Sequence, residues 1–156
     1  MLWVTETMAK EIKLIVFKLN GKDYGIPVHD VFGIEKMQHI TRVPGTAPFI
    51  KGVINLRGIV TPVIDLRRRF LMEERPYTDE TRIIIVAHNG VEVGLIVDAA
   101  NDVIDIYEES IEPPPEVGDY EEDDSITGIV NLDKRLLILI DLEKVLDSEK
   151  LKEACN

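Results

Sequence analysis

Residues 48–67 have the sequence PFIKGVINLRGIVTPVIDLR, in which two apolar runs flank Arg57-Gly58. The runs extend from Gly52 to Leu56 and from Ile59 to Ile64. Short segments rich in isoleucine and valine are typical of strands. Because glycine has no Cβ, it suits the sharp bend between them. The segment therefore predicts two strands joined at a tight turn.

The same pattern recurs later in the chain at a constant spacing. Residues 52–66 match residues 128–142, with an offset of 76 from Gly-Val-Ile-Asn-Leu to Gly-Ile-Val-Asn-Leu. A second pair of segments, residues 20–28 and 89–97, begins with Asn-Gly and matches at an offset of 69. The two offsets differ because the second half contains an insertion. Two matching units predict a pseudo-symmetric pair of small β-subdomains.

The remaining apolar runs predict further short strands. Asn20-Gly21 separates two of them, and Asn-Gly is a strong hairpin signal because a type I′ turn needs positive φ at both central residues. Residues 43–48 predict a loop, since two prolines and a glycine are incompatible with a regular ladder. The additional strands expected are residues 12–19, 23–28, 82–87, 91–97 and 136–140.

Two segments have helical spacing. Val31, Ile34 and Met37 recur every third residue, but Gly33 disfavours a helix, so a short turn followed by a strand is an equal alternative. A C-terminal helix is expected from about Asp141, with four apolar residues on one face. These are Leu142, Val145, Leu146 and Leu151. Many short strands and one helix predict an all-β, barrel-type fold rather than βαβ units.

The distribution of charge argues against nucleic acid as a partner. The chain has 156 residues and a formal net charge of −11. Residues 105–124 contain ten acidic residues and no lysine or arginine, and we expect this segment to be a solvated surface loop. Phosphate binding needs basic patches. Since no apolar run approaches the roughly 20 residues of a membrane-spanning helix, direct membrane insertion is not expected either.

The histidine and cysteine content predicts no metal site, catalytic centre or cofactor. His29, His39 and His88 are scattered and lack ligand spacing. Cys155 is the only cysteine, which rules out an internal disulfide and fits a reducing cytosol. Residues 52–58 have neither the glycine spacing nor the Lys-Ser/Thr pair of a phosphate-binding loop.

Three aspartates that follow apolar runs leave two interpretations open. Asp65 and Asp141 occupy equivalent repeat positions, each directly before a leucine. This favours helix N-caps, in which a side-chain oxygen accepts hydrogen bonds from free backbone N–H groups. The alternative is that both converge with Asp98 for acid–base chemistry, as in a small β-barrel hydrolase. No nucleophile or metal motif accompanies them.

The repeat also singles out Arg57 and Gly58. Positions that both halves need for folding should be alike in both, as Asn55 and Asn131 are. Arg57-Gly58 instead corresponds to Asp133-Lys134, so the scaffold does not require this pair. The planar guanidinium of arginine suits either a structural ion pair or contact with a partner. Both interpretations remain open at this point.

Residues 48–67 resemble the hallmark motif of the CheW-like domain family. The similarity continues in residues 24–28, 93–98 and 136–142 and covers about residues 12–150. It implies a single domain with internal repeat halves of about 12–80 and 81–150, after an N-terminal tail of residues 1–11. The sequence leaves open whether translation starts at Met1 or at Met8. It also implies two SH3-like five-stranded β-barrel subdomains, in agreement with the repeat.

The resemblance also implies a function. Proteins of this kind are non-enzymatic adaptors of chemotaxis. They bind the regulatory domain of the histidine kinase CheA and the cytoplasmic tip of transmembrane chemoreceptors, the methyl-accepting chemotaxis proteins. The expected location is therefore the cytoplasm, with recruitment to membrane-associated receptor arrays. A detached fragment of CheA, whose regulatory domain shares this fold, is the alternative.

In this family, receptor binding uses an apolar surface near the junction of the two barrels. The matching positions here are Val31, Ile34, Gly52, Arg57, Gly58, Ala100 and Val103. The four aliphatic residues suit the apolar face of a helix, although they could equally belong to the core. The two glycines could serve backbone geometry alone. Family members often have a larger aliphatic residue where this chain has Ala100.

Overall fold

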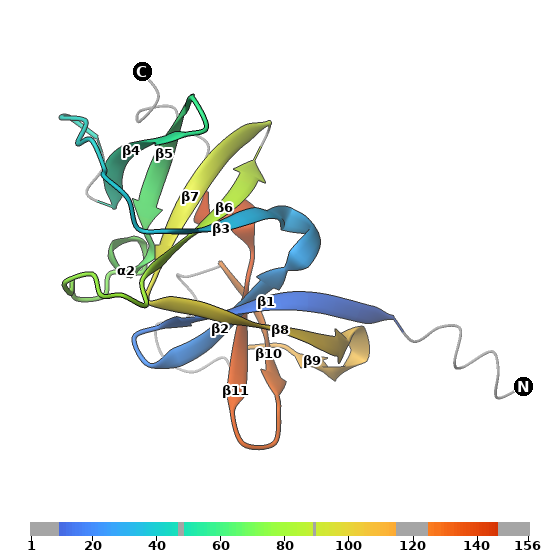
Figure 1. The fold of residues 1–156 in the computed structure, drawn as a ribbon. Helices are drawn as coiled ribbons and strands as arrows, with labels where there is room; N and C mark the ends of the chain where they lie inside the picture. Colours follow the sequence, from blue (N-terminus) through green and yellow to red (C-terminus); the bar gives the residue numbers. More distant parts are fainter. Residues whose placement is uncertain (1–9, 47–48, 89, 115–124, 147–156) are drawn as a thin grey trace, which may run out of the picture.

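The computed structural model describes residues 10–46, 49–88, 90–114 and 125–146 and consists mainly of β-strands (Figure 1). The strands form two sheets. Two one-turn helices, α2 (Leu66–Arg69) and α3 (Leu142–Val145), each follow the last strand of a repeat motif. The predicted all-β fold is confirmed.

The first sheet contains the strands β1 (Glu11–Leu19), β2 (Lys22–Pro27), β8 (Ala99–Tyr107), β9 (Ile111–Glu112), β10 (Ile126–Asn131) and β11 (Leu136–Ile140). Their order across the sheet is β8-β1-β2-β11-β10-β9. The two outer strands are separated in sequence only by the 3₁₀ turn η2 (Glu108–Ser110). The two edges therefore belong to one continuous segment, and the sheet curls into what we call the first barrel.

The second sheet contains the strands β3 (Val31–Lys36), β4 (Ile50–Leu56), β5 (Ile59–Asp65), β6 (Arg82–His88) and β7 (Val91–Val97). Their order is β3-β6-β7-β5-β4. Thr41, just after β3, exchanges two backbone hydrogen bonds of 2.8 Å with Val53 on β4. This bridge links the two edges and closes what we call the second barrel.

Each barrel contains strands from both repeat halves. The hairpin β1–β2 of the first half lies in the first barrel with strands of the second half, and the hairpin β6–β7 of the second half lies in the second barrel. The hairpin β1–β2 is attached to the first barrel by parallel pairing of β2 with β11, and the hairpin β6–β7 to the second barrel by parallel pairing of β7 with β5. The first sheet also has six strands rather than five, because η2 divides its closing segment into β8 and β9.

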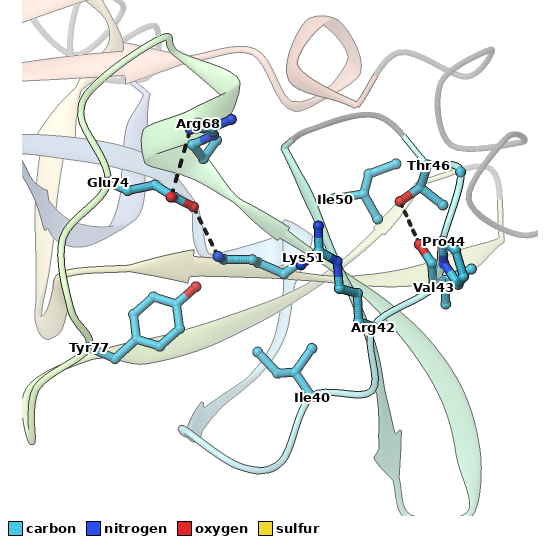
Figure 2. A pocket seen from close by; sticks show the side chains of 11 residues that line it. Ile40, Arg42, Val43, Pro44, Thr46, Ile50, Lys51, Arg68, Glu74 and Tyr77 are labelled. Carbon is cyan, nitrogen blue, oxygen red and sulfur yellow. Dashed lines mark hydrogen bonds and ion pairs between the residues drawn. The ribbon is translucent and has the colours of Figure 1, made fainter.

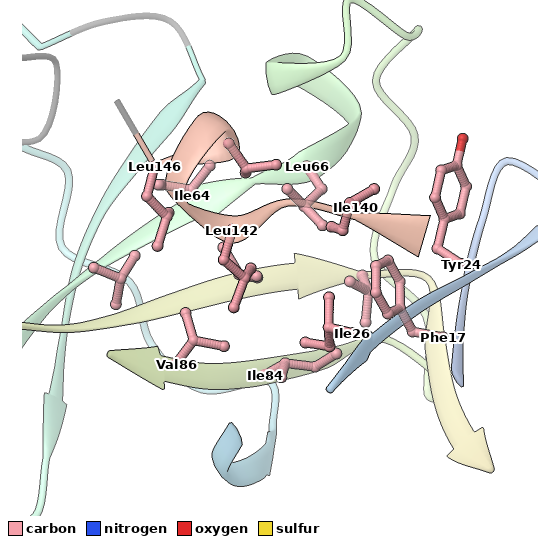
Figure 3. Close-up of a cluster of buried hydrophobic side chains, with 14 of the residues drawn as sticks. Phe17, Tyr24, Ile26, Ile64, Leu66, Ile84, Val86, Ile140, Leu142 and Leu146 are labelled. Carbon is pink, nitrogen blue, oxygen red and sulfur yellow. The ribbon is translucent and has the colours of Figure 1, made fainter. Parts of the chain in front are cut away.

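The hydrophobic core has three parts. One cluster fills each barrel, and the largest cluster joins the two barrels (Figure 3). Alternate residues of β1 explain this arrangement, since Leu14 and Val16 point into the first barrel while Ile15 and Phe17 point into the joint. β6 likewise contributes to its own barrel and to the joint. We call the shared cluster the inter-barrel core.

The local structure differs from the sequence-based predictions in several segments. Residues 31–36 form a strand, preceded by the 3₁₀ turn η1 (Val28–Asp30), so the helical alternative for this segment is wrong. The nine-residue strand β8 was not predicted, because its sequence AANDVIDIY mixes apolar and acidic residues. α3 begins directly after Asp141 as expected. The acidic segment, predicted to be a loop over residues 105–124, instead forms the end of β8, η2 and β9 over residues 105–112. Leu151 and residues 115–124 lie outside the described residues.

Candidate partner-binding surface

Four of the predicted surface residues lie on equivalent strands of the two barrels. Val31 and Ile34 are on β3, and Ala100 and Val103, 69 positions later, are on β8. The register of β3 against β6 shifts by one residue after Val31, and β8 has a matching shift against β1. Such a bulge places residues three apart on the same face of a strand. The spacing that resembled a helix is therefore that of a bulged strand.

These four residues border the inter-barrel core. Ile34 is paired with Ile84 and Val103 with Ile15, and both partners belong to the inter-barrel core. Since directly opposed side chains share a face, Ile34 and Val103 lie at the rim of this core. They are 40% and 53% exposed. Val31 and its counterpart Ala100 on β8 are half-buried against the inter-barrel core. One part of each residue therefore packs in the core while another part is exposed at the surface.

Arg57 lies at the β4–β5 turn and reaches toward β3. Its Nη2 is 3.6 Å from Oε2 of Glu35, but its side chain is 74% exposed. The backbone φ is 51° at Arg57 and 64° at its counterpart Asp133. Aspartate tolerates this left-handed region better than arginine. The turn therefore does not explain the arginine, and an exposed ion pair contributes little to stability.

Backbone geometry accounts for both predicted glycines. The N–H of Gly58, at φ 85°, donates to Oδ1 of Asn55 at 2.7 Å. The corresponding side chain, Asn131, accepts from the N–H of Asp133, which explains why asparagine occurs in both repeats. Gly52 has φ 150°, and a Cβ there would lie 2.1 Å from the carbonyl oxygen of Thr41. Its lack of a side chain lets the chain close the second barrel.

Sequence reasoning missed a partly buried ion pair between Arg67 and Asp98. The guanidinium Nε donates to Oδ1 of Asp98 at 2.9 Å and Nη2 donates to Oδ2. Nη1 donates to the carbonyl oxygen of Glu73 at 3.1 Å. Oδ2 of Asp98 also accepts from the backbone N–H of Asn20 at 2.8 Å. This network ties the β1–β2 turn of the first barrel to α2 of the second.

Asp65 and Asp141 have the predicted capping role. Each accepts a hydrogen bond from the backbone N–H two residues later, at 3.0 Å and 2.9 Å. Tyr77 also donates from its hydroxyl to Oδ2 of Asp65 at 3.2 Å, and burial raises the pKa of Tyr77 above its ordinary value of 10.0. Asp98 is engaged by Arg67. Each of the three carboxylates thus accepts structural hydrogen bonds, and Arg67 contributes to two of them, through its backbone N–H to Asp65 and its guanidinium to Asp98.

Within residues 10–46, 49–88, 90–114 and 125–146, no three histidine, cysteine or acidic side chains are placed so that they could hold a metal ion. In the same part of the chain, no helix has the length and apolar character needed to cross a membrane.

Comparison with known proteins decides the family. The sequence model of the CheW-like domain matches residues 13–150. The chain belongs to the CheW-like domain family. The chemotaxis protein CheW of Bacillus subtilis is 56% identical over 142 residues, 91% of each chain. That of Klebsiella aerogenes is 38% identical over 146 residues, 94% of this chain and 87% of the relative.

A solved structure supports the same assignment. The scaffolding protein TtCheW from Thermoanaerobacter tengcongensis matches with a TM-score of 0.81 and 42% sequence identity. The match covers 90% of this chain and 96% of that chain. The CheW-like chain is therefore a chemotaxis scaffold or coupling protein.

The Asp98–Arg67 pair of this CheW-like domain predicts a pH dependence. Burial alone would raise the pKa of the Asp98 carboxyl, but hydrogen bonds from Arg67 and from the Asn20 N–H outweigh it and hold the pKa below 3.8. A carboxyl whose pKa is lower in the folded than in the unfolded state stabilises the fold at pH values above its unfolded-state pKa. This stabilisation is lost as the pH falls toward the folded-state pKa. We expect the stability advantage of wild type over Asp98→Asn to shrink below about pH 4.

Urea unfolding of both proteins between about pH 3 and pH 7 checks this expectation. An advantage of wild type that stays constant over the whole range would contradict it.

Proposed function

We propose that the chain is a non-enzymatic adaptor that couples chemoreceptors to the histidine kinase CheA in signalling arrays. The observation that carries the proposal is the match to chemotaxis proteins named CheW over nearly the whole chain, together with a neighbour described as a scaffolding protein. In this proposal the protein works in the cytoplasm and needs no cofactor. Its partners are the regulatory domain of CheA and the cytoplasmic tip of the receptors.

The proposed receptor site is the apolar rim formed by β3 and β8. Ile34 and Val103 are exposed there, and Val31 and Ala100 lie at the edge of the inter-barrel core. An amphipathic receptor helix could bury its apolar face against these aliphatic side chains. Arg57 is mostly exposed beside β3 and would offer its free donors to a carboxylate or carbonyl oxygen of the partner. Gly52 and Gly58 would support this surface through backbone geometry.

An adaptor of this kind needs two attachments. If CheA binds one barrel while the receptor binds near the joint, the second attachment becomes effectively intramolecular and raises the overall avidity. Each interface can then remain modest, as in reversible signalling complexes. Titration of the full chain into the labelled regulatory domain of a cognate CheA, and separately into a receptor-tip fragment, tests the proposal. We expect saturable micromolar binding to both, and no binding to either would refute it.

Replacing Arg57 with alanine should separate the two interpretations of this residue. Because the ion pair with Glu35 is exposed, we expect the free energy of unfolding to fall by no more than about 0.5 kcal/mol. Binding to the receptor-tip fragment should weaken by about tenfold or more if the guanidinium contacts the receptor. Urea unfolding and the same titration measure the two effects.

Glu35→Ala is the matched control for Arg57→Ala, because it breaks the ion pair but keeps the guanidinium. It should preserve receptor binding. A stability loss of several kcal/mol in Arg57→Ala with unchanged binding would support the structural interpretation instead.

A further inference from the structure

A cavity of about 570 Å³ lies on the second barrel, between the loop that follows β3, the start of β4, α2 and the segment that precedes β6 (Figure 2). Its volume is in the range of binding sites for small ligands and peptide side chains. Three cations and one carboxylate line it, namely Arg42, Lys51, Arg68 and Glu74. Positive charge therefore prevails locally in a chain whose net charge is −11. We call this cavity the cationic pocket.

The cationic pocket already holds one carboxylate of the chain itself. Lys51 Nζ donates to Oε1 of Glu74 at 2.9 Å, and Arg68 Nη1 lies 3.8 Å from Oε2 (Figure 2). The hydrogen bond from Lys51, together with the charges of Lys51, Arg68 and Arg42, lowers the pKa of Glu74 below its ordinary value of 4.5. The positive charges in the pocket thus favour an ionised carboxylate, and the pocket is large enough to contain a carboxylate group.

The positive charge of Arg42 is not neutralised by an ion pair with a carboxylate in the described part of the chain. In the described part of the chain, no carboxylate lies within ion-pair distance of Arg42, which is exposed at the pocket wall. The guanidinium fork can accept a second carboxylate in two parallel hydrogen bonds. The pocket lining also includes the apolar side chains of Ile40, Val43 and Pro44. The pocket therefore joins free cationic donors to a surface that suits an aliphatic side chain.

We propose that the cationic pocket binds an acidic segment of a partner protein, with a carboxylate on Arg42 and Lys51 and a neighbouring aliphatic residue against Ile40 and Pro44. A peptide can contact both the cations and the neighbouring side chains of Ile40 and Pro44, whereas a free inorganic anion would contact the cations alone. Lys51 and Arg57 lie near opposite ends of β4, about 20 Å apart at strand spacing. The pocket is thus a site separate from the rim formed by β3 and β8.

Titration of the purified full chain with a capped Leu-Glu-Glu-Leu peptide, followed by backbone amide NMR, tests the proposal. We expect saturable shifts at residues 42–46 and around Lys51 and Glu74, and much smaller shifts with the Leu-Gln-Gln-Leu peptide. Arg42→Glu should weaken peptide binding by about tenfold or more. Lys134→Glu, an equal charge change at the exposed β10–β11 turn, is the matched control and should bind the peptide as wild type does.

A second variant strengthens the test. Glu74→Gln removes the competing internal carboxylate and should tighten peptide binding, since Lys51 and Arg68 lose their partner. The proposal fails if the peptide causes no shifts in the pocket or if Lys134→Glu weakens binding as much as Arg42→Glu. It also fails if inorganic phosphate alone reproduces the shifts at the same concentration, which would assign a simple anion site. The test needs neither kinase nor receptor, so its outcome is independent of the proposed adaptor function.

Discussion

Replacing Gly52 with alanine is expected to lower the free energy of unfolding by about 3 kcal/mol or more. The new Cβ would lie 2.1 Å from the carbonyl oxygen and 2.8 Å from the carbonyl carbon of Thr41. Both are backbone atoms of the bridge that closes the second barrel, so neither can move aside without breaking its hydrogen bonds to Val53. The positive φ of 150° at Gly52 adds conformational strain.

Two other glycines provide graded controls for Gly52→Ala. Gly58 has a positive φ of 85° but open space around its Cβ position, so Gly58→Ala should cost only about 1 kcal/mol. The repeat counterpart Gly128 would place its Cβ 2.5 Å from Cγ2 of Ile111 and 3.0 Å from the carbonyl oxygen of Glu112. Since this approach is less close than that at Gly52 and Gly128 has no positive φ, Gly128→Ala should fall between the two. Urea unfolding of the three variants gives the ranking. Equal losses at Gly52 and Gly58 would show that strain rather than barrel closure dominates.

Replacing Arg67 with alanine should lower the free energy of unfolding by about 3 kcal/mol. The Arg67 side chain is 8% exposed. Its removal leaves Oδ1 of Asp98 and the carbonyl of Glu73 without their donor, and among the described residues only the Asn20 N–H still donates to the Asp98 carboxylate. This loss of stability should stay below the roughly 5 kcal/mol that marks the upper end of the range for breaking a buried ion pair. The reason is that Asp98 is 35% exposed, so water can solvate its carboxylate. Chemical denaturation at neutral pH measures the effect.

Arg68→Ala is the neighbouring control for Arg67→Ala. The Arg68 side chain is 39% exposed and its guanidinium is 3.8 Å from Glu74, so its removal should cost no more than about 0.5 kcal/mol. The double variant Arg67→Ala with Asp98→Asn should be less destabilised than the sum of the two single variants, because the pair is lost only once. Strict additivity would show that Arg67 and Asp98 are not coupled.

Local sequence signals predicted much of the fold correctly. The Asn20-Gly21 hairpin, the strands around residues 52–64 and the N-caps at Asp65 and Asp141 all depend on residues close together in the chain. Turn chemistry and capping act over two or three residues, so they can be inferred from a single sequence. The repeat offsets also identified equivalent elements in the two barrels.

The candidate surface could be predicted only in part. The family motif indicated Arg57 and the aliphatic positions, but not which side chains are exposed. The bulge in β3 decides that Val31 and Ile34 share one face, and pairing with β6 decides that this face borders the inter-barrel core. The cationic pocket had no signal at all, because Arg42, Lys51 and Arg68 come from three separate elements.

The sequence by itself determined the all-β class, the duplication, the turns and caps, and the resemblance to the CheW-like family. Only the tertiary structure decided that the two halves exchange hairpins, and that Arg67 joins the barrels through Asp98. The partners of a strand can be distant in sequence, so local propensity does not determine which strands pair. Here β1 and β6 bury apolar side chains on both faces, and this burial stabilises the observed pairing. The repeat pattern thus specified the elements, while long-range packing specified their partners.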